Sequence, residues 1–184
     1  VFEGLVLINK NLIVDNPALV KPGTKFIMKE GKSIIFKNKA LILGEESNKV
    51  VFEGQKSNTK WGTISIEGDD SFIKNVELSG GFGTVLNNKF YTSMLSIRNS
   101  KNISLYNVDL IQNNEISIPE YYDDLLHVIY SNNVLIKNSN FYNSIGDALD
   151  VDVSEVKISN CYFENSGNDS IDFMSSIGSI LNTN

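Results

Sequence analysis

The sequence predicts an all-β fold, a right-handed parallel β-helix in which short strands stack from one coil to the next. Three observations predict this solenoid: segments that recur at near-constant spacing, apolar and polar residues that alternate within each segment, and an asparagine that recurs at one position. Parallel crossover connections are right-handed in nearly all proteins, which gives the expected hand. We therefore expect coils of about 22–31 residues with an asparagine ladder.

The asparagine column comes from four segments that read apolar, polar, Asn, small or apolar, polar, large apolar. The segments start at Ile73, Leu105, Ile136 and Ile158, and their third residues are Asn75, Asn107, Asn138 and Asn160. Asparagine favours turns because its side chain bonds nearby backbone groups. In stacked coils these amides would form a ladder at a turn, each bonding the amides above and below.

A second set of five segments supplies another strand in each coil. The reference residues are Ile64, Leu95, Leu126, Leu149 and Ile171, separated by 31, 31, 23 and 22 residues. We expect them to form one inward stack, and the residues two positions later to form the next: Ile66, Ile97, Val128, Val151 and Phe173. This spacing favours a parallel β-helix over a β-sandwich, which would need hairpin turns every 8–12 residues.

We expect one domain over residues 1–184, irregular over 1–60 and regular over 61–184. In the irregular part, a turn at Pro22-Gly23-Thr24 precedes expected strands at residues 26–28, 33–36, 40–43 and 49–53. The pattern still runs at Asn184, with no segment that would cover the last strand, so we expect a longer protein that continues beyond it.

Composition excludes several classes of protein. Hydrophobic residues make up 41% of the chain, but no apolar run approaches the roughly 20 residues of a membrane span, so no membrane insertion is expected. A net charge of −6 argues against a nucleic-acid partner, which a basic face would bind. Cys161 is the only cysteine, so an internal disulfide is excluded and a buried thiol is expected.

The chain resembles the right-handed β-helix superfamily with carbohydrate-binding and sugar-hydrolase type repeats, which includes pectate lyases, polygalacturonases, alginate lyases, mannuronan C5-epimerases and phage tailspikes. The resemblance rests on the turn at Pro22, the strand from Trp61 to Ile66 and the repeated Asn segments. It covers nearly the whole chain and implies a secreted or cell-envelope protein with a polysaccharide partner. The polygalacturonase signatures Asn-Thr-Asp, Gly-His-Gly and Arg-Ile-Lys and the epimerase Asp-Pro-His-Asp motif are absent, and only an Asp123-Asp124 pair occurs, in a different setting. No specific member is therefore assigned.

The strand alignment predicts a cluster of ionisable residues on one outer face. One outward column holds Ser65, Ser96, His127, Asp150 and Asp172, and the neighbouring column holds Glu67, Arg98, Ile129, Asp152 and Met174. Directly stacked carboxylates repel by about 3 kcal/mol at an effective dielectric constant of 20. A Ca²⁺ ion bound by Asp150, Asp152 and Asp172, a shared proton, or salt bridges from Arg98 and His127 would relieve this repulsion.

The predicted catalytic residues are His127, Asp150, Asp172 and Arg98, and the chemistry is left open among three reactions. A lyase or epimerase needs a base for the sugar C5 proton and a cation that stabilises the carboxylate, which His127 and Arg98 match. A glycoside hydrolase needs two carboxyl groups, which Asp150 and Asp172 match. The alternative is that these exposed charges only solvate an outer face, or that they bind a cation or glycan without turnover.

Two insertions and one further acidic column flank this face. The insertions, near residues 79–91 and 112–123, bring Tyr91, Tyr121 and Tyr122 beside the columns, and with Glu67 these are the expected substrate-binding residues. The alternative is that the aromatic rings pack the loops onto the sheet. The acidic column of Asp124, Asp147 and Asp169 is expected to cap turns, with cation binding as the less favoured interpretation.

The sequence is compatible with two functions from different classes. The first is an enzyme that cleaves or epimerises an acidic extracellular polysaccharide on the face around His127. The second is a non-catalytic β-helix, as in a glycan-binding module, an adhesin or a tailspike-like stalk, in which the acidic face is merely solvated. Loss of turnover on substitution of His127 or Asp150 would favour the first.

Overall fold

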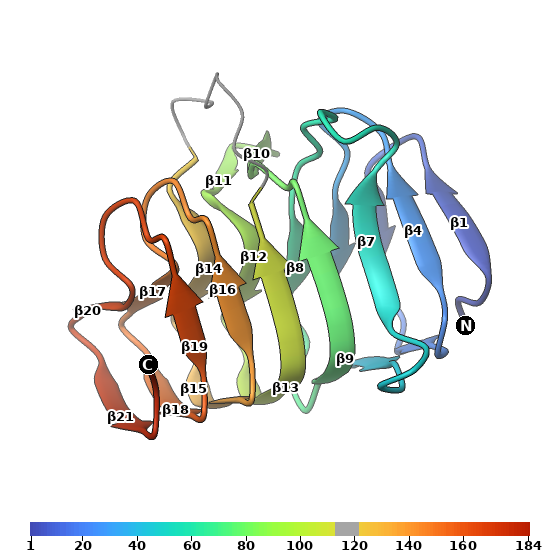
Figure 1. Ribbon diagram of the computed structural model, residues 1–184. Coiled ribbons are helices and arrows are strands. Elements are labelled where there is room, and N and C mark those ends of the chain that lie inside the picture. Colours follow the sequence, from blue (N-terminus) through green and yellow to red (C-terminus); the bar gives the residue numbers. More distant parts are fainter. Residues whose placement is uncertain (113–121) are drawn as a thin grey trace.

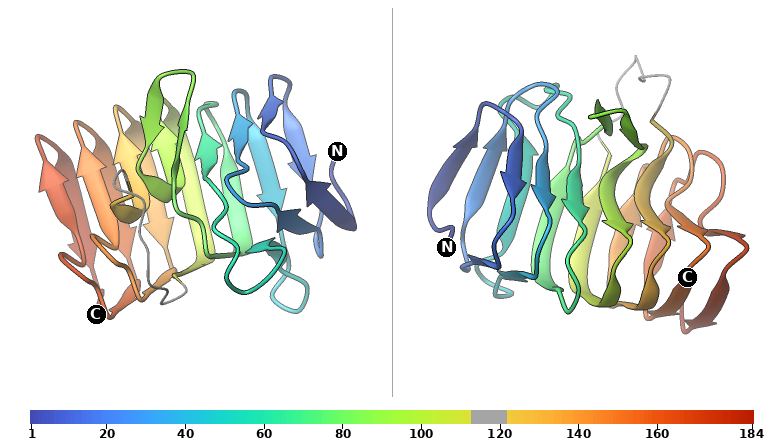
Figure 2. Two further views of the ribbon diagram at one scale, coloured as in Figure 1. Left: turned by 90° about the horizontal axis from the view of Figure 1, so that it is seen from above. Right: turned by 180° about the vertical axis from the view of Figure 1, so that it is seen from behind.

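The computed structural model describes residues 1–112 and 122–184, and over these residues the chain is all-β. The strands follow one another along a single axis, so that the amino and carboxyl ends of the chain lie at opposite ends of the stack (Figure 1). Two views from other directions show the same progression (Figure 2). Within the described ranges, no helix that could cross a membrane is found.

One parallel sheet has seven strands, in the order β2-β5-β8-β12-β14-β17-β20. Its members are β2 (Leu12–Val14), β5 (Ile34–Phe36), β8 (Ile64–Ile66), β12 (Ser93–Arg98), β14 (Asp124–Ile129), β17 (Leu149–Asp152) and β20 (Asp172–Met174). Each strand pairs in parallel with the strand of the next repeat, as the sequence spacing predicts.

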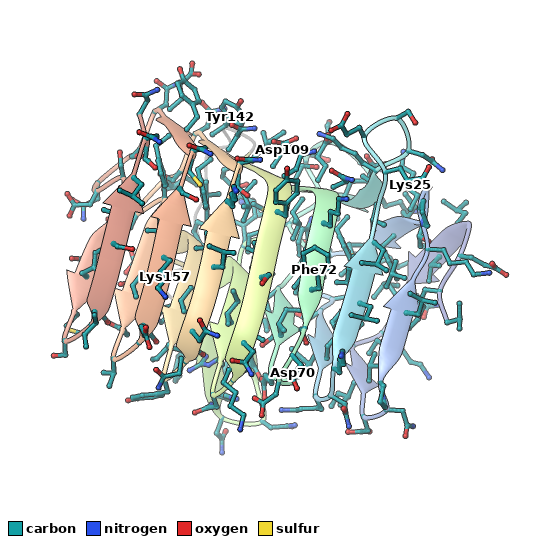
Figure 3. All side chains as sticks on the ribbon, turned by 90° about the horizontal axis from the view of Figure 1, so that it is seen from below. Lys25, Asp70, Phe72, Asp109, Tyr142 and Lys157 are labelled. Atoms are coloured by element: carbon teal, nitrogen blue, oxygen red, sulfur yellow. The ribbon has the colours of Figure 1, made fainter. Side chains whose placement is uncertain are left out.

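The second parallel sheet has twelve strands, and its main path is β1-β4-β7-β9-β13-β15-β18-β21. These strands are β1 (Leu5–Ile8), β4 (Lys25–Met28), β7 (Val50–Gly54), β9 (Phe72–Ser79), β13 (Lys101–Ile111), β15 (Asn132–Lys137), β18 (Glu155–Ser159) and β21 (Ile177–Leu181). Four shorter strands join it: β3 (Ala18–Val20), β6 (Ala40–Leu43), β16 (Asn140–Tyr142) and β19 (Tyr162–Glu164). Figure 3 shows the side chains of this sheet, with Lys25, Phe72 and Lys157 labelled on β4, β9 and β18.

The core lies between the two sheets, and its registers are those that the repeats predict. Leu95 pairs with Ile64 and Leu126, and Val128 pairs with Ile97 and Val151. These six side chains are at most 2% exposed. Aromatic rings continue the stacking, because Phe26 lies on Phe52 and Phe141 on Phe163, each with ring centroids 4.5 Å apart.

The recurring asparagines lie where the chain bends. Asn75, Asn107, Asn138 and Asn160 all have φ between 50° and 53°. This left-handed conformation is one that asparagine tolerates better than other non-glycine residues. The Asn107 amide donates to Asn75 Oδ1 at 2.6 Å, and the Asn160 amide donates to Asn138 Oδ1 at 3.2 Å. The asparagine column therefore joins neighbouring repeats at these bends.

Residues 1–60, which were expected to be irregular, contain more strands than the sequence predicted. The expected strands at 26–28, 33–36, 40–43 and 49–53 correspond to β4 to β7, and three earlier strands, β1 to β3, pair with them as further members of the same two sheets. Trp61 is fully buried, and its Nε1 donates to the Ser79 carbonyl at 2.7 Å.

The first insertion forms an antiparallel hairpin of β10 (Thr84–Leu86) and β11 (Lys89–Tyr91). Asn87 and Asn88 connect the strands with φ of 51° and 59°, and two consecutive positive φ angles are typical of the tight turns that suit hairpins. The hairpin stands out from the stack (Figure 2). It brings Lys89 and Tyr91 beside the seven-stranded sheet.

Candidate functional site

The predicted outward column is formed by strands β8, β12, β14, β17 and β20. Ser96 pairs with Ser65 and with His127, His127 pairs with Asp150, and Asp150 pairs with Asp172. The neighbouring column is aligned in the same way, because Ile129 pairs with Arg98 and with Asp152. The predicted register is therefore confirmed over the whole of the first column and, in the second, from Arg98 to Met174.

His127 lies at the centre of a cluster of carboxyl groups. Its Nε2 is 3.2 Å from Asp152 Oδ2 and 3.4 Å from Asp150 Oδ2. On the other side of the ring, Nδ1 is 3.1 Å from Thr92 Oγ1 and 4.0 Å from Asp124 Oδ2. The side chain of His127 is only 10% exposed. The imidazole is therefore enclosed between acidic groups of two repeats, with Thr92 contributed by a third.

The hydrogen bonds of His127 depend on which ring nitrogen carries the proton. Nδ1 lies 3.1 Å from Thr92 Oγ1, whose hydroxyl donates to Asp124 Oδ2 at 3.2 Å, and Nε2 lies 3.2 Å from Asp152 Oδ2. When Thr92 accepts the proton of Nδ1, a neutral imidazole has its lone pair on Nε2, facing the Oδ2 atoms of Asp150 and Asp152. A proton on Nε2, or a cation in the same place, makes both contacts favourable.

Burial and mutual repulsion shift the ionisation of this cluster. Burial, reinforced by the charges of Asp150 and Asp123, raises the pKa of Asp124 to about 8. Burial, with the charges of Asp152 and Asp172, raises the pKa of Asp150 to about 7. Burial lowers the pKa of His127, although its hydrogen bond with Asp152 acts in the opposite direction. Each of these groups is thus shifted toward its uncharged form.

Asp124 is the member of the cluster that the sequence did not assign as a site residue. Capping of turns was expected for its column, and Asp147 does this, because its Oδ1 accepts from the Asp169 backbone N–H and from the Asn168 amide, each at 2.8 Å. Asp124 instead lies in β14, three residues before His127, and is 1% exposed. The Asp-x-x-His spacing was the available signal, but nothing in the sequence placed Thr92 between the two side chains.

The calcium site expected on Asp150, Asp152 and Asp172 stays a prediction. Asp150 and Asp152 do converge on His127, while Asp172 is exposed and lies on the next strand, β20. The groups whose ligand atoms lie within 4.8 Å of one another are Asp124, His127 and Asp150. Of the three predicted calcium ligands, this set contains Asp150, and Asp124 and His127 stand where Asp152 and Asp172 were expected.

Arg98 and Glu67 belong to a second group of charges on the same face. The Glu67 carboxylate accepts hydrogen bonds from Lys37 Nζ at 2.5 Å, from the Tyr91 hydroxyl at 2.7 Å and from Lys89 Nζ at 3.1 Å. Although burial raises the pKa of Glu67, these donors outweigh it and lower the pKa below 4.5. The Arg98 guanidinium lies 5.1 Å from the centroid of the Tyr91 ring and donates to the Phe90 carbonyl.

The predicted aromatic platforms are placed differently from one another. Tyr91 is 2% exposed and holds Glu67, so burial and that carboxylate raise its pKa. Tyr122 is 7% exposed, packs against Phe82 with ring centroids 5.2 Å apart and accepts a hydrogen bond from the Gln112 amide. Tyr121 lies outside the described residues. The two described tyrosines therefore contribute packing and hydrogen bonds to the walls of the face.

Unpaired polar atoms gather around His127. Five buried side-chain nitrogen or oxygen atoms lack a hydrogen-bond partner among the described residues: Ser96 Oγ, Arg98 Nε, Asp124 Oδ1, Asp152 Oδ1 and Ser144 Oγ. The first four belong to β12, β14 and β17, the strands that surround His127. Buried polar groups are nearly always satisfied in folded proteins, and exceptions need a ligand, water or ion as partner. This concentration makes the face around His127 the candidate binding site.

Comparisons with known proteins find similar structures but no similar sequences. No protein-family model and no curated protein sequence matches the chain. Among solved structures, it is similar to an alginate lyase from Paenibacillus sp. str. FPU-7 (TM-score 0.39, 14% identity, covering 89% of this chain and 69% of that one). It is also similar to a protein assigned as a glycosyl hydrolase from Parabacteroides merdae ATCC 43184 (TM-score 0.44, 14% identity, covering 98% and 82%).

A third similar structure is a mannuronic acid specific polysaccharide family 6 lyase enzyme from human gut microbiota (TM-score 0.40, 12% identity). The match covers 91% of this chain and 48% of that enzyme. These neighbours are of the kind that the sequence resemblance names. At such identities an activity has to be argued from the residues of this chain.

Proposed function

We propose that the protein acts on an extracellular, acidic polysaccharide as a lyase or epimerase, at the outer face around His127. The observation that supports this most is the concentration of unpaired buried donors and acceptors on β12, β14 and β17. Sugar hydroxyl and carboxylate groups can supply both kinds of partner. On a face that is only solvated, these polar atoms would be exposed to water, because burying them without partners costs free energy.

The reaction that suits this arrangement is removal of the C5 proton from a uronate residue. The C5–H bond breaks, a base takes the proton, and the electron pair moves into the carboxylate group, which becomes enolate-like. Members of the column of His127, Asp150 and Asp172 supply the base, and Arg98 is the nearby positive group that stabilises the developing charge. In a lyase, the C4–O bond then breaks to give a C4–C5 double bond and a protonated leaving oxygen. In an epimerase, a proton returns to the other face of C5.

We also propose the type of solenoid, the path of the polymer along it and the location of the protein. The stack is a segment of a right-handed parallel β-helix, which the parallel registers and the one-strand-per-repeat order of the seven-stranded sheet support. A polymer can lie along such a sheet across several repeats, as is common on the extended faces of solenoids. Because polymers of this kind lie outside the cell, a secreted or envelope location follows from the proposed substrate.

The proposal is tested by incubating the protein with uronate polymers, and with a neutral glucan as control, in heavy water. Deuterium that enters at C5, or unsaturated sugar ends, would show proton removal, and both are read by NMR. His127→Ala and Asp150→Asn should each lower the rate by at least about a hundredfold, the usual contribution of a positioned acid or base. If the protein binds a uronate polymer, neither product forms and both variants bind it equally well, the non-catalytic alternative is correct.

A further inference from the structure

We infer that Asp124, His127 and Asp150, with Asp152 as a fourth ligand, bind a divalent transition-metal cation of the Zn²⁺ or Mn²⁺ type. One ligand atom from each of the first three residues lies within 4.8 Å of the others. The Oδ2 atom of Asp152 lies 3.2 Å from His127 Nε2. This inference rests on the proposed function, for which it names the group that neutralises the acidic cluster.

Two carboxylate oxygens converge on one ring nitrogen of His127. With the proton of His127 on Nδ1, beside Thr92, the Nε2 lone pair faces Asp152 Oδ2 at 3.2 Å and Asp150 Oδ2 at 3.4 Å. Ligand atoms that surround a metal tetrahedrally at 2.0–2.1 Å lie about 3.3 Å apart, which matches these two separations. A cation in place of a proton beside Nε2 makes both contacts attractive.

Two carboxylate oxygens that take no part in those contacts support the site independently. Asp124 is 1% exposed and the Asp152 side chain is 13% exposed, and each has a buried Oδ1 without a hydrogen-bond partner among the described residues. The only donor described for Asp124 is the Thr92 hydroxyl, on Oδ2. A buried carboxylate oxygen without a donor is costly, and metal coordination is one of the few ways to satisfy it.

The kind of metal follows from the donor set. Ca²⁺ and Mg²⁺ take oxygen ligands almost exclusively, whereas an imidazole nitrogen suits first-row transition metals. One imidazole among carboxylates therefore favours Zn²⁺ or Mn²⁺ over Ca²⁺. Thr92 also supports this choice, because metal-binding histidines usually donate their other ring N–H to an oxygen that fixes the ring, and Nδ1 meets Thr92 Oγ1 at 3.1 Å.

This site leaves a role for Asp172 in the proposed reaction. Asp172 lies on β20 in register with Asp150, and it is exposed. With His127 and Asp150 bound to the cation, Asp172 is the carboxylate of the column that remains open to a substrate. The cation would then supply positive charge next to Arg98, on the side of the face where a uronate carboxylate has to be held.

The test is direct measurement of metal binding to the chain by calorimetry with ZnCl₂, MnCl₂ and CaCl₂, and by electron paramagnetic resonance of Mn²⁺. We expect Zn²⁺ or Mn²⁺ to bind at one equivalent per chain and at least about tenfold more tightly than Ca²⁺. Asp124→Asn and His127→Gln should each weaken binding by about tenfold or more. Asp172→Asn, an acidic substitution in the same column outside the ligand set, should leave the affinity unchanged. Thermal melting without metal verifies that each variant is folded.

Three outcomes would overturn the inference: no binding of Zn²⁺ or Mn²⁺, tighter binding of Ca²⁺ with loss on Asp172→Asn, or full affinity in a folded Asp124→Asn variant. The second would support the calcium set of Asp150, Asp152 and Asp172 instead. Metal binding is read without any substrate, so it separates this inference from the proposed function. Turnover on a uronate polymer without any metal binding would overturn the inference and leave the enzyme proposal intact, whereas tight binding without turnover on any uronate polymer would do the reverse.

Discussion

Two groups of carboxylates on the same outer face differ in how well they are satisfied. Glu67 is only 9% exposed, yet two lysines and a tyrosine hydroxyl donate to it, and Ser65 Oγ lies 3.3 Å from its carboxylate. Around His127, by contrast, Asp124 and Asp152 bury oxygens without any donor among the described residues. The pKa of Glu67 is lowered, while those of Asp124 and Asp150 are raised.

The difference separates a carboxylate that the protein itself satisfies from carboxylates that it leaves without donors. A carboxylate that the protein itself fully pairs has no affinity left for a substrate or a cation. One that the protein buries without partners must obtain them from outside or remain uncharged. For this reason Glu67, expected to bind substrate, is in a position to anchor the β10–β11 hairpin through Lys89 and Tyr91, while the His127 cluster remains the candidate site.

The largest effect on stability is expected from Glu67→Gln. The substitution removes a buried charge from Lys37 and Lys89, so we expect the free energy of unfolding to fall by about 1–3 kcal/mol in denaturant titrations. Glu53→Gln is the control, because Glu53 pairs with Lys25 at 2.7 Å in a more exposed setting and should cost less than about 1 kcal/mol. Equal losses in the two variants would show that the Glu67 group is not the better satisfied of the two.

The Glu67 group should also make stability depend on acid. Its pKa in the folded protein is lower than the ordinary 4.5, so its contribution is fully present above that pH and is lost as the pH falls through the folded value. The gap in unfolding free energy between the wild type and Glu67→Gln should therefore close in acid. Melting curves from about pH 7 down to about pH 3 test this, and a gap that persists at the lowest pH would contradict it.

The smallest effect on stability is expected from two serines that are neighbours on adjacent strands, one beside each group of carboxylates. Ser65 and Ser96 are paired in register and both are fully buried, but only Ser65 has a partner, in Glu67. Ser65→Ala should cost about 1 kcal/mol, whereas Ser96→Ala should leave stability unchanged or slightly higher, because it removes an unpaired buried hydroxyl. The measurement is chemical unfolding of both variants without metal. A loss in Ser96→Ala as large as in Ser65→Ala would mean that Ser96 has a partner after all.

Much of the fold could be predicted because the repeats carry their own register. The alternation within each segment and the steps of 31, 31, 23 and 22 residues placed Ser96, His127, Asp150 and Asp172 in one column, and the strand pairs confirm it. The strands β1 to β3 and the β10–β11 hairpin were not predicted. The former pair with β4, β5 and β6 at offsets of 20, 22 and 22 residues, but their segments do not align with the repeated sequence patterns. The latter depends on a short turn, Asn87–Asn88, inside an insertion.

By itself, the sequence determined which side chains share a face, because a strand repeats every two residues and the repeats fix how strands stack. Only the tertiary structure decided which of these side chains find partners. Glu67 meets Lys37 and Lys89, which are 30 and 22 residues away, and Thr92 meets His127 across 35 residues. Burial and charge pairing depend on distances in space between side chains from different repeats and insertions, and the insertions follow no period from which those distances could be read.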